Sequence, residues 1–255
     1  FGLYQEMSYW INERWRIFVA KEAGARAPWS QDPIFNLTRF CNVHRENDRV
    51  TRWVRANWNR DTDPVWRFVL ARMINWPTSL ELVAGETKIP LIIEMLKDRR
   101  AQGNKIFNSA YTISTCGRSM DKLDYVGELC NNVRALEQST PPQYSTLKET
   151  ARWLGAVNGL GTFLAAQVVA DMKNTPNHPL QQAEDWWSWS APGPGSLKGL
   201  RWYFGHDKIT PKHYQAYLSV CMKEVLPHVN PEVPRISAQD FQNCLCEFSK
   251  WCRVK

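Results

Sequence analysis

The spacing of apolar residues is helical along most of the chain. Between Tyr4 and Lys21 they recur at intervals of three and four residues, at Met7, Trp10, Ile11, Trp15, Phe18 and Val19. This period places them on one face of an amphipathic helix. The same period predicts helices in segments 30–40, 47–58, 63–74, 80–84, 90–100, 121–136, 147–154, 162–173, 211–226 and 238–252. The predicted fold class is therefore mainly α.

Three segments depart from this pattern. Segment 104–116 alternates and is rich in β-branched residues, which predicts one short β hairpin among the helices. Segment 174–205 is the least regular and holds four of the 15 prolines. The stretch STPPQY at 139–144 is a candidate boundary between two lobes. We therefore expect residues 1–255 to form a single two-lobed helical domain.

Charge and cysteine content narrow the classes of partner. The chain has 32 Lys and Arg against 25 Asp and Glu, a net charge of +7 that favours a polyanionic partner. Its 13 Trp residues suit cores, interfaces or stacking surfaces. The seven Cys form no CxxC pair, which fits a reducing compartment and predicts no metal site. No apolar run is long enough to span a membrane, and the charged first twenty residues argue against a secretory signal.

The segment Leu147–Lys173 has the form of a helix-hairpin-helix. Two short helical patterns flank the sequence Val-Asn-Gly-Leu-Gly, and glycines permit a tight turn there. The exposed N–H groups of such a turn, with the positive end of the next helix, can hold a DNA phosphate. The candidate DNA contacts are Asn158, Gly159, Gly161 and Thr162. The alternative is a plain turn between two helices.

A second candidate is the arginine-rich segment 39–60. Arg45, Arg49 and Arg52 are spaced at four and three residues, so a helix would place them on one face, opposite Trp53 and Trp58. Such a basic face suits phosphate contact. The alternative is a solvated face whose charge is neutralised by neighbouring carboxylates, Glu46 and Asp48.

A third candidate is the sequence DWWSWSAPGPGSLKGLR at 185–201. Glycines such as Gly193 and Gly195 would let a ligand approach the backbone, while Ser196 and Lys198 offer a donor and a cation. The tryptophans at 186, 187 and 189 offer stacking planes. The sequence has no GxxxxGK[S/T] loop, which excludes a kinase of that class. Alternatively, the glycines and prolines form a turn between packed elements.

Two carboxylates are candidate general bases. Asp171 closes the helix after the hairpin, and Asp185 lies 24 residues beyond Gly161. A carboxylate near DNA phosphates is repelled unless it has a role there. For Asp171, a helix cap or a salt bridge is the competing interpretation.

Several motifs together resemble one family. They are WINERWRIFVAKEAG at 10–24, PWS at 28–30 with Asp32, RFCNV at 39–43, RENDRVTR at 45–52, the hairpin, GPGSLKG, and CLCEFSK at 244–250. They resemble the phage α-glutamyl/putrescinyl-thymine pyrophosphorylases. The same group includes the amino acid:DNA transferases and the helical domain of 5-hydroxymethyluracil DNA kinases. The resemblance spans nearly the whole chain.

The resemblance implies a helical fold related to helix-hairpin-helix DNA glycosylases, and a role in thymidine hypermodification of phage DNA. In that pathway an amine from an amino acid or a polyamine displaces pyrophosphate from 5-(pyrophosphomethyl)uracil after base flipping. The resemblance implies DNA with modified bases and a small amine donor as partners, in the cytoplasm of an infected bacterium. It also allows for a Mg²⁺ ion that assists pyrophosphate release.

The implied roles fall on the candidates above. The catalytic candidates are Asp185, Asp171 and Lys198. Pyrophosphate and substrate contacts fall on Arg39, Asn42, Arg45, Glu46, Asp48, Arg49, Gly193, Gly195 and Ser196, with Arg52 as a further DNA contact. Two other functions stay open, a helix-hairpin-helix DNA glycosylase and a non-catalytic DNA-binding module. The identity of the amine, the strandedness of the DNA and the oligomeric state do not follow from the sequence.

Overall fold

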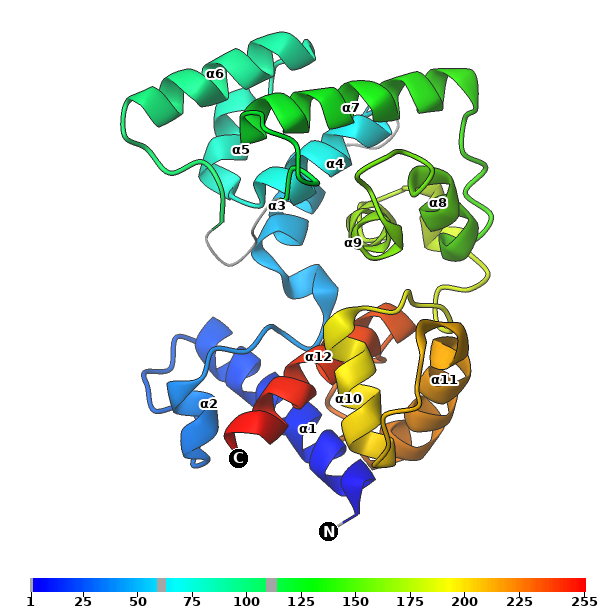
Figure 1. Cartoon of the computed structure of the whole chain (residues 1–255). Helices are drawn as coiled ribbons and strands as arrows, with labels where there is room; N and C mark the ends of the chain where they lie inside the picture. Colours follow the sequence, from blue (N-terminus) through cyan, green and yellow to red (C-terminus); the bar gives the residue numbers. More distant parts are fainter. Residues whose placement is uncertain (1, 59–62, 109–113) are drawn as a thin grey trace. The chain divides into compact units, whose positions relative to one another are not determined.

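The computed structural model describes residues 2–58, 63–108 and 114–255. These residues form helices joined by turns and loops, with no strand among them, which confirms the predicted mainly α class (Figure 1). The β hairpin predicted at 104–116 is absent from the parts of that segment that the structure describes, and residues 109–113 lie outside those parts. In place of a strand partner, the backbone at Ile106 accepts a hydrogen bond of 2.9 Å from the Ser79 hydroxyl.

The chain folds into two compact units. Unit 1 comprises residues 1–48 and 185–255, and unit 2 comprises residues 49–184. The chain passes from one unit to the other after residue 48 and again after residue 184. The boundary suggested at 139–144 coincides with neither position, because that stretch lies inside unit 2. There the indole N–H of Trp153 donates to the carbonyl of Thr140 at 2.7 Å and holds the proline-rich link against the following helix.

Unit 1 is built around the helix α12. Its helices are α1 (Leu3–Glu22), α2 (Pro33–Leu37), α10 (Pro194–Phe204), α11 (Tyr214–Val225) and α12 (Ala238–Val254), with short 3₁₀ turns η1 (Arg45–Asn47), η3 (Pro211–His213) and η4 (Leu226–His228). α12 packs on α1, α10 and α11, and all five helices contribute aromatic residues to the core. The predicted helix at 4–21 is confirmed as α1.

Unit 2 contains the hairpin and the arginine-rich helix. Its elements are α3 (Arg49–Asn57), α4 (Val65–Ile74), α5 (Pro77–Val83), α6 (Ile89–Ala101), α7 (Lys122–Ser139), α8 (Leu147–Leu154), α9 (Thr162–Lys173) and η2 (Pro179–Gln182). α4 packs on α7, and α8 packs on α9. No described helix is long and apolar enough to cross a lipid bilayer.

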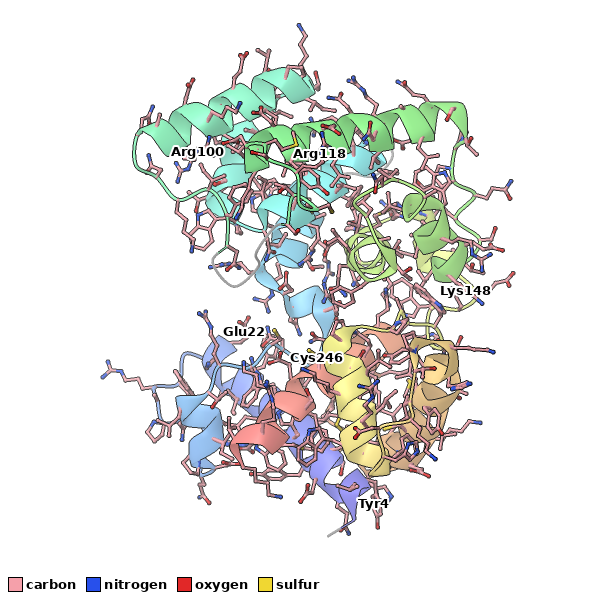
Figure 2. The ribbon with its side chains drawn as sticks, viewed as in Figure 1. Tyr4, Glu22, Arg100, Arg118, Lys148 and Cys246 are labelled. Atoms are coloured by element: carbon pink, nitrogen blue, oxygen red, sulfur yellow. The ribbon has the colours of Figure 1, made fainter. Side chains whose placement is uncertain are left out.

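Two glycines allow α10 and α12 of unit 1 to pack closely. A Cβ atom on Gly199 would lie 2.2 Å from the carbonyl oxygen of Leu245, and one on Gly195 would lie 2.1 Å from the sulfur of Cys246. Cys246, labelled in Figure 2, belongs to α12. The sequence GPGSLKG therefore begins a helix within a segment predicted to be irregular, and these glycines serve helix packing. This corrects the expectation that Gly195 lets a ligand approach the backbone.

Replacing Gly199 by Ala should destabilise the protein by about 1–3 kcal/mol, because the new methyl group overlaps a backbone atom that cannot move away freely. Urea unfolding measures this difference. Gly85→Ala is the matched control, since a Cβ at position 85 meets nothing within 4 Å. Equal midpoints for the two variants would contradict the packing role.

Candidate functional site

An extended segment, residues 39–45, lies along α12 in unit 1. Side chains of α12 bind its backbone at successive turns of the helix. Asp240 accepts from the amide of Arg45 at 2.8 Å, Glu247 accepts from the amide of Cys41 at 3.0 Å, and Asn243 donates to the carbonyl of Asn42 at 3.0 Å. Lys250 donates to the carbonyl of Arg39. The motifs RFCNV and CLCEFSK, about 200 residues apart, thus form one structural element.

Arg14 of α1 fastens this segment from the other side. Its Nε donates to the carbonyl of Cys41 at 2.9 Å, and its Nη2 donates to the side-chain oxygen of Asn42. The side chain is buried with 7% exposure, and its Nη1 has no hydrogen-bond partner. Burial lowers the pKa of this guanidinium, since the charged form loses hydration. A buried N–H without an acceptor carries a desolvation penalty that a bound anion would remove.

Arg45 is a second arginine at this segment with unsatisfied donors. It follows Asn42 by three residues, a chain length of about 10 Å when extended. Its Nε and Nη2 are both buried without a hydrogen-bond partner among the described residues. Two arginines with unmet donors therefore flank the backbone of residues 41–45, and this pair is the candidate anion site.

Arg14 was missed in the sequence analysis, although a signal was present. It lies four residues after Trp10 and three before Ile17, and all three side chains are buried. An arginine inside the apolar stripe of a helix is the pattern that marks it. The predicted stripe placed Val19 on the buried face, but Val19 is 47% exposed.

The other predicted residues of segment 39–48 lie around this pair. Arg39 is exposed, and Asn42 is held in place because its side-chain amide donates to the carbonyl of Asn47 at 2.9 Å. Glu46 belongs to η1, and Asp48 is its C-cap. No group of three or more His, Cys, Asp or Glu in the described part of the chain is arranged to hold a metal ion.

Cys41 is not suited to act as a thiolate nucleophile. Its side chain reaches solvent, yet the packed atoms around its sulfur raise its pKa to about 11, with Glu247 adding to the effect. At neutral pH the thiol is therefore protonated.

Ser196 and Gly193 serve as a helix cap. Gly193 is the N-cap of α10, and its amide donates to the Ser196 hydroxyl at 3.1 Å. Ser196 is buried, and Gln242 donates to the same oxygen at 3.4 Å. This corrects the prediction that Ser196 offers a donor to a ligand. Lys198, in contrast, is exposed on the following turn.

The two candidate bases lie in different units. Asp185 begins unit 1's second segment, where its carbonyl accepts from the amides of Ser188 and Trp189 in a turn. Its side chain is half-buried.

Asp171 lies in the core of unit 2, where both of its carboxylate oxygens are engaged. Arg72 donates to Oδ2 from Nε at 2.8 Å and to Oδ1 from Nη2 at 2.5 Å, and Thr51 donates to Oδ1 at 2.6 Å. Asp171 is 0% exposed. Its carboxylate therefore joins α3, α4 and α9, which contradicts its prediction as a catalytic base.

The segment predicted as a helix-hairpin-helix lies in unit 2, where two helices flank a short turn. α8 ends at Leu154, and α9 begins at Thr162 without a side-chain cap at Gly161. Gly159 has φ of 97°, and a Cβ there would lie 2.4 Å from the hydroxyl of Tyr125, so only glycine fits. Asn158, Gly161 and Thr162 are exposed, which leaves the amino end of α9 open to an anion.

The arginine-rich helix is shorter than predicted. α3 begins at Arg49, with Trp53 and Val54 on its buried side and Arg52 exposed, as expected. Arg45 belongs to η1 of unit 1, so it does not share a helical face with Arg49. Arg45 stays outside α3 because its backbone amide donates a hydrogen bond to Asp240, which holds Arg45 on α12.

One comparison identifies the family. The family described as "5-hmdU DNA kinase, helical domain" matches residues 2–255.

The chain belongs to this family.

The match to the 5-hmdU DNA kinase helical domain covers both units. It places the chain in DNA modification that involves 5-hydroxymethyluracil and implies DNA as a partner. No curated protein and no solved structure matches the chain.

Replacing Asp171 by Asn should destabilise the protein by about 3–5 kcal/mol, because Arg72 would be left buried without a counter-charge. Chemical unfolding measures this change in the free energy of unfolding. Adding Arg72→Met to the same chain should restore part of the lost stability. Glu128→Gln, which breaks the exposed pair with Arg118, should leave the stability nearly unchanged, because solvent screens that pair. An Asp171→Asn variant of unchanged stability would contradict the structural assignment.

Proposed function

We propose that this chain replaces the pyrophosphate of 5-(pyrophosphomethyl)uracil in DNA with an amine from an amino acid or a polyamine. The observation that supports this most directly is a pair of arginines, the buried Arg14 and the half-buried Arg45, whose buried guanidinium nitrogens have unmet hydrogen-bond donors. Membership in the 5-hmdU DNA kinase helical-domain family supplies the DNA context.

The arginine pair suits a pyrophosphate leaving group. Guanidinium groups bind phosphate oxygens through paired, charge-assisted hydrogen bonds, which are about twice as strong as neutral ones. Donors fixed in place before the reaction stabilise the charge that develops on the departing oxygen. Arg14 is fixed in this way by Cys41 and Asn42, and Lys250 and Arg39 add positive charge at the same segment.

The proposed reaction is a substitution at the methylene carbon on C5 of the base. The amine nitrogen forms a bond to that carbon while the carbon–oxygen bond breaks, and its electron pair leaves with pyrophosphate. The amine must lose a proton, for which Asp185 is the proposed acceptor because Asp171 is engaged in an ion pair. Glu46 and Asp48 are proposed contacts for the amine, and Lys198 for the departing anion. A Mg²⁺ ion would add charge neutralisation, but no step proposed here depends on it.

The hairpin is the proposed DNA-binding element of unit 2. The open amino end of α9, with exposed Gly161 and Thr162, would accept a backbone phosphate, and Arg49 and Arg52 of α3 lie on a neighbouring helix. The hydrogen bond between Thr51 and Asp171 joins α3 to α9. This contact lies about 13 Å from the hairpin, measured along the axis of α9. One strand of DNA could therefore contact both elements of this unit.

A non-catalytic DNA-binding module is the second candidate. The engagement of Asp171 favours it, because that removes one of the two proposed bases. In this case the chain would bind modified DNA and leave its bases unchanged. A DNA glycosylase would instead produce abasic sites, so the products separate all three functions.

Incubation with DNA that contains 5-(pyrophosphomethyl)uracil and a panel of amines should release pyrophosphate and yield amine-substituted nucleosides, detected by mass spectrometry. Arg45→Gln should lower kcat/KM about 10²–10³-fold, as the loss of a preorganised donor does in other enzymes. Its stability should be unchanged or raised, because Arg45 has buried donors without partners. Arg26→Gln, an exposed arginine, is the matched control. Unchanged DNA with every amine would reject the transferase in favour of the binding module.

Thr162→Glu should separate DNA binding from stability. A carboxylate in the first turn of α9 should stabilise the protein by about 0.3–1 kcal/mol through the helix dipole. The same charge should weaken binding of duplex DNA roughly tenfold by repelling a phosphate, and less so at high salt. Thr162→Gln keeps the size without the charge. Equal DNA affinity for both variants would place the DNA contact elsewhere.

A further inference from the structure

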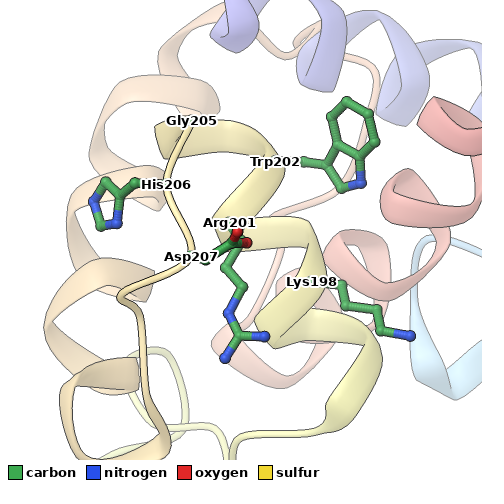
Figure 3. Close-up of a pocket in the computed structure, with 6 residues that line it drawn as sticks. All are labelled: Lys198, Arg201, Trp202, Gly205, His206 and Asp207. Atoms are coloured by element: carbon green, nitrogen blue, oxygen red, sulfur yellow. The ribbon is translucent and has the colours of Figure 1, made fainter.

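The outer face of α10 in unit 1 carries a groove of about 430 Å³ (Figure 3). Residues of the last two turns of α10 and of the loop that follows line it, and they are Lys198, Arg201, Trp202, Gly205, His206 and Asp207. None of these residues except Lys198 was singled out by the sequence motifs. Lys198 is the residue that the groove shares with the proposed reaction.

The two faces of α10 have opposite character. Gly199, Leu200 and Tyr203 are buried on one side, with Gly199 against α12. Lys198, Arg201 and Trp202 lie at intervals of three and four residues on the opposite side. The close packing of one face therefore presents two cations and an indole together on the other.

Trp202 is an open stacking surface. It is 49% exposed, and no aromatic or cationic side chain in the described parts of the chain covers its ring. Figure 3 shows the ring projecting from α10. Trp187, also in unit 1, makes a useful contrast: it is 40% exposed, but Arg235 lies over its ring at 3.9 Å from the centroid.

The cation next to it is held in a fixed orientation. Arg201 donates from Nε and Nη2 to the carbonyl of Ile209, at 3.2 and 2.9 Å. On the far side of the groove the ring of His206 packs against Phe204 and Tyr217, and its buried Nδ1 has no hydrogen-bond partner. Two side chains of the groove, Arg201 and His206, are therefore held in place, which lowers the entropy that they lose when a ligand binds.

We propose that this groove binds an unpaired nucleotide of a nucleic-acid strand, with the base stacked on Trp202 and its phosphate at Lys198 and Arg201. An aromatic plane beside fixed cations is the arrangement by which proteins hold single strands. Cβ atoms four residues apart on a helix lie about 5–6 Å from each other, comparable to the separation of a base from its own phosphate. Asp207 is the one carboxylate of the lining, and it repels phosphate from its end of the groove.

This site does not depend on amine transfer. It concerns strand binding by unit 1 alone, so a chain that transfers no amine can still bind a strand here. Conversely, transferase activity with no base-dependent signal from Trp202 would reject the groove and leave the proposed function intact.

The test uses the full chain labelled with 5-fluorotryptophan. The ¹⁹F resonance of residue 202 is assigned as the one missing from Trp202→Phe, and it is followed during titration with a short oligothymidine. A strand of the same length with abasic residues, and free thymidine monophosphate, form the other two arms. We expect the oligothymidine to shift this resonance at lower concentration than either comparison ligand.

Affinities of variants complete the test. Trp202→Ala should weaken oligothymidine binding roughly five- to hundredfold, the range found for loss of one stacked base. Asp207→Asn should strengthen it about two- to fivefold, a gain that loss of a structural contact would not give. Trp187→Ala, the covered tryptophan, should bind like the unmodified chain.

Three results would overturn the proposal. The first is an abasic strand that binds as tightly as oligothymidine, since stacking would then contribute nothing. The second is free thymidine monophosphate that binds as tightly as the strand, which would assign the groove to a soluble nucleotide. The third is an acidic peptide that shifts the Trp202 resonance as strongly, which would assign it to a protein partner.

Discussion

The buried guanidinium of Arg14 is the constraint on which the candidate site depends. It holds residues 41 and 42 through Nε and Nη2, while α12 holds the same extended segment from the other side through Asp240, Asn243 and Glu247. These bonds occupy most of the polar groups around the segment, but they leave Nη1 of Arg14 and two nitrogens of Arg45 unsatisfied. Burying such donors costs free energy, and the proposed anion would recover it by accepting their hydrogen bonds.

Local patterns in the sequence predicted the helices and several of their buried faces. The apolar period located α1, α3, α4, α7, α9, α11 and α12, and the glycines at 159 and 161 located the hairpin. The position of Arg14 in the apolar stripe of α1 was equally readable. The β hairpin predicted at 104–116 rested on alternation and β-branching alone, and in the described part of that segment the backbone at Ile106 accepts a hydrogen bond from the distant Ser79.

Contacts between distant residues could not be predicted in the same way. Asp171 and Arg72 are 99 residues apart, so nothing near Asp171 in the sequence showed that its charge is neutralised. Gly199 and Leu245 are 46 residues apart, and without its partner the sequence GPGSLKG was equally compatible with a ligand loop. In both cases residues that were expected to act on a ligand instead stabilise the packing of helices. Arg14 and Arg45 define the candidate site because their unmet donors belong to cations attached to the same extended segment.

Titration of the protein with inorganic pyrophosphate tests the central claim most directly. The guanidinium N–H signals of Arg14 and Arg45 can be followed by ¹⁵N NMR while calorimetry gives the affinity. The account predicts one pyrophosphate site per chain and shifts of the signals of both arginines. It also predicts weaker binding of orthophosphate, which has fewer oxygens to accept hydrogen bonds from both guanidinium groups. Absence of binding, or binding that leaves both sets of signals unchanged, would contradict it.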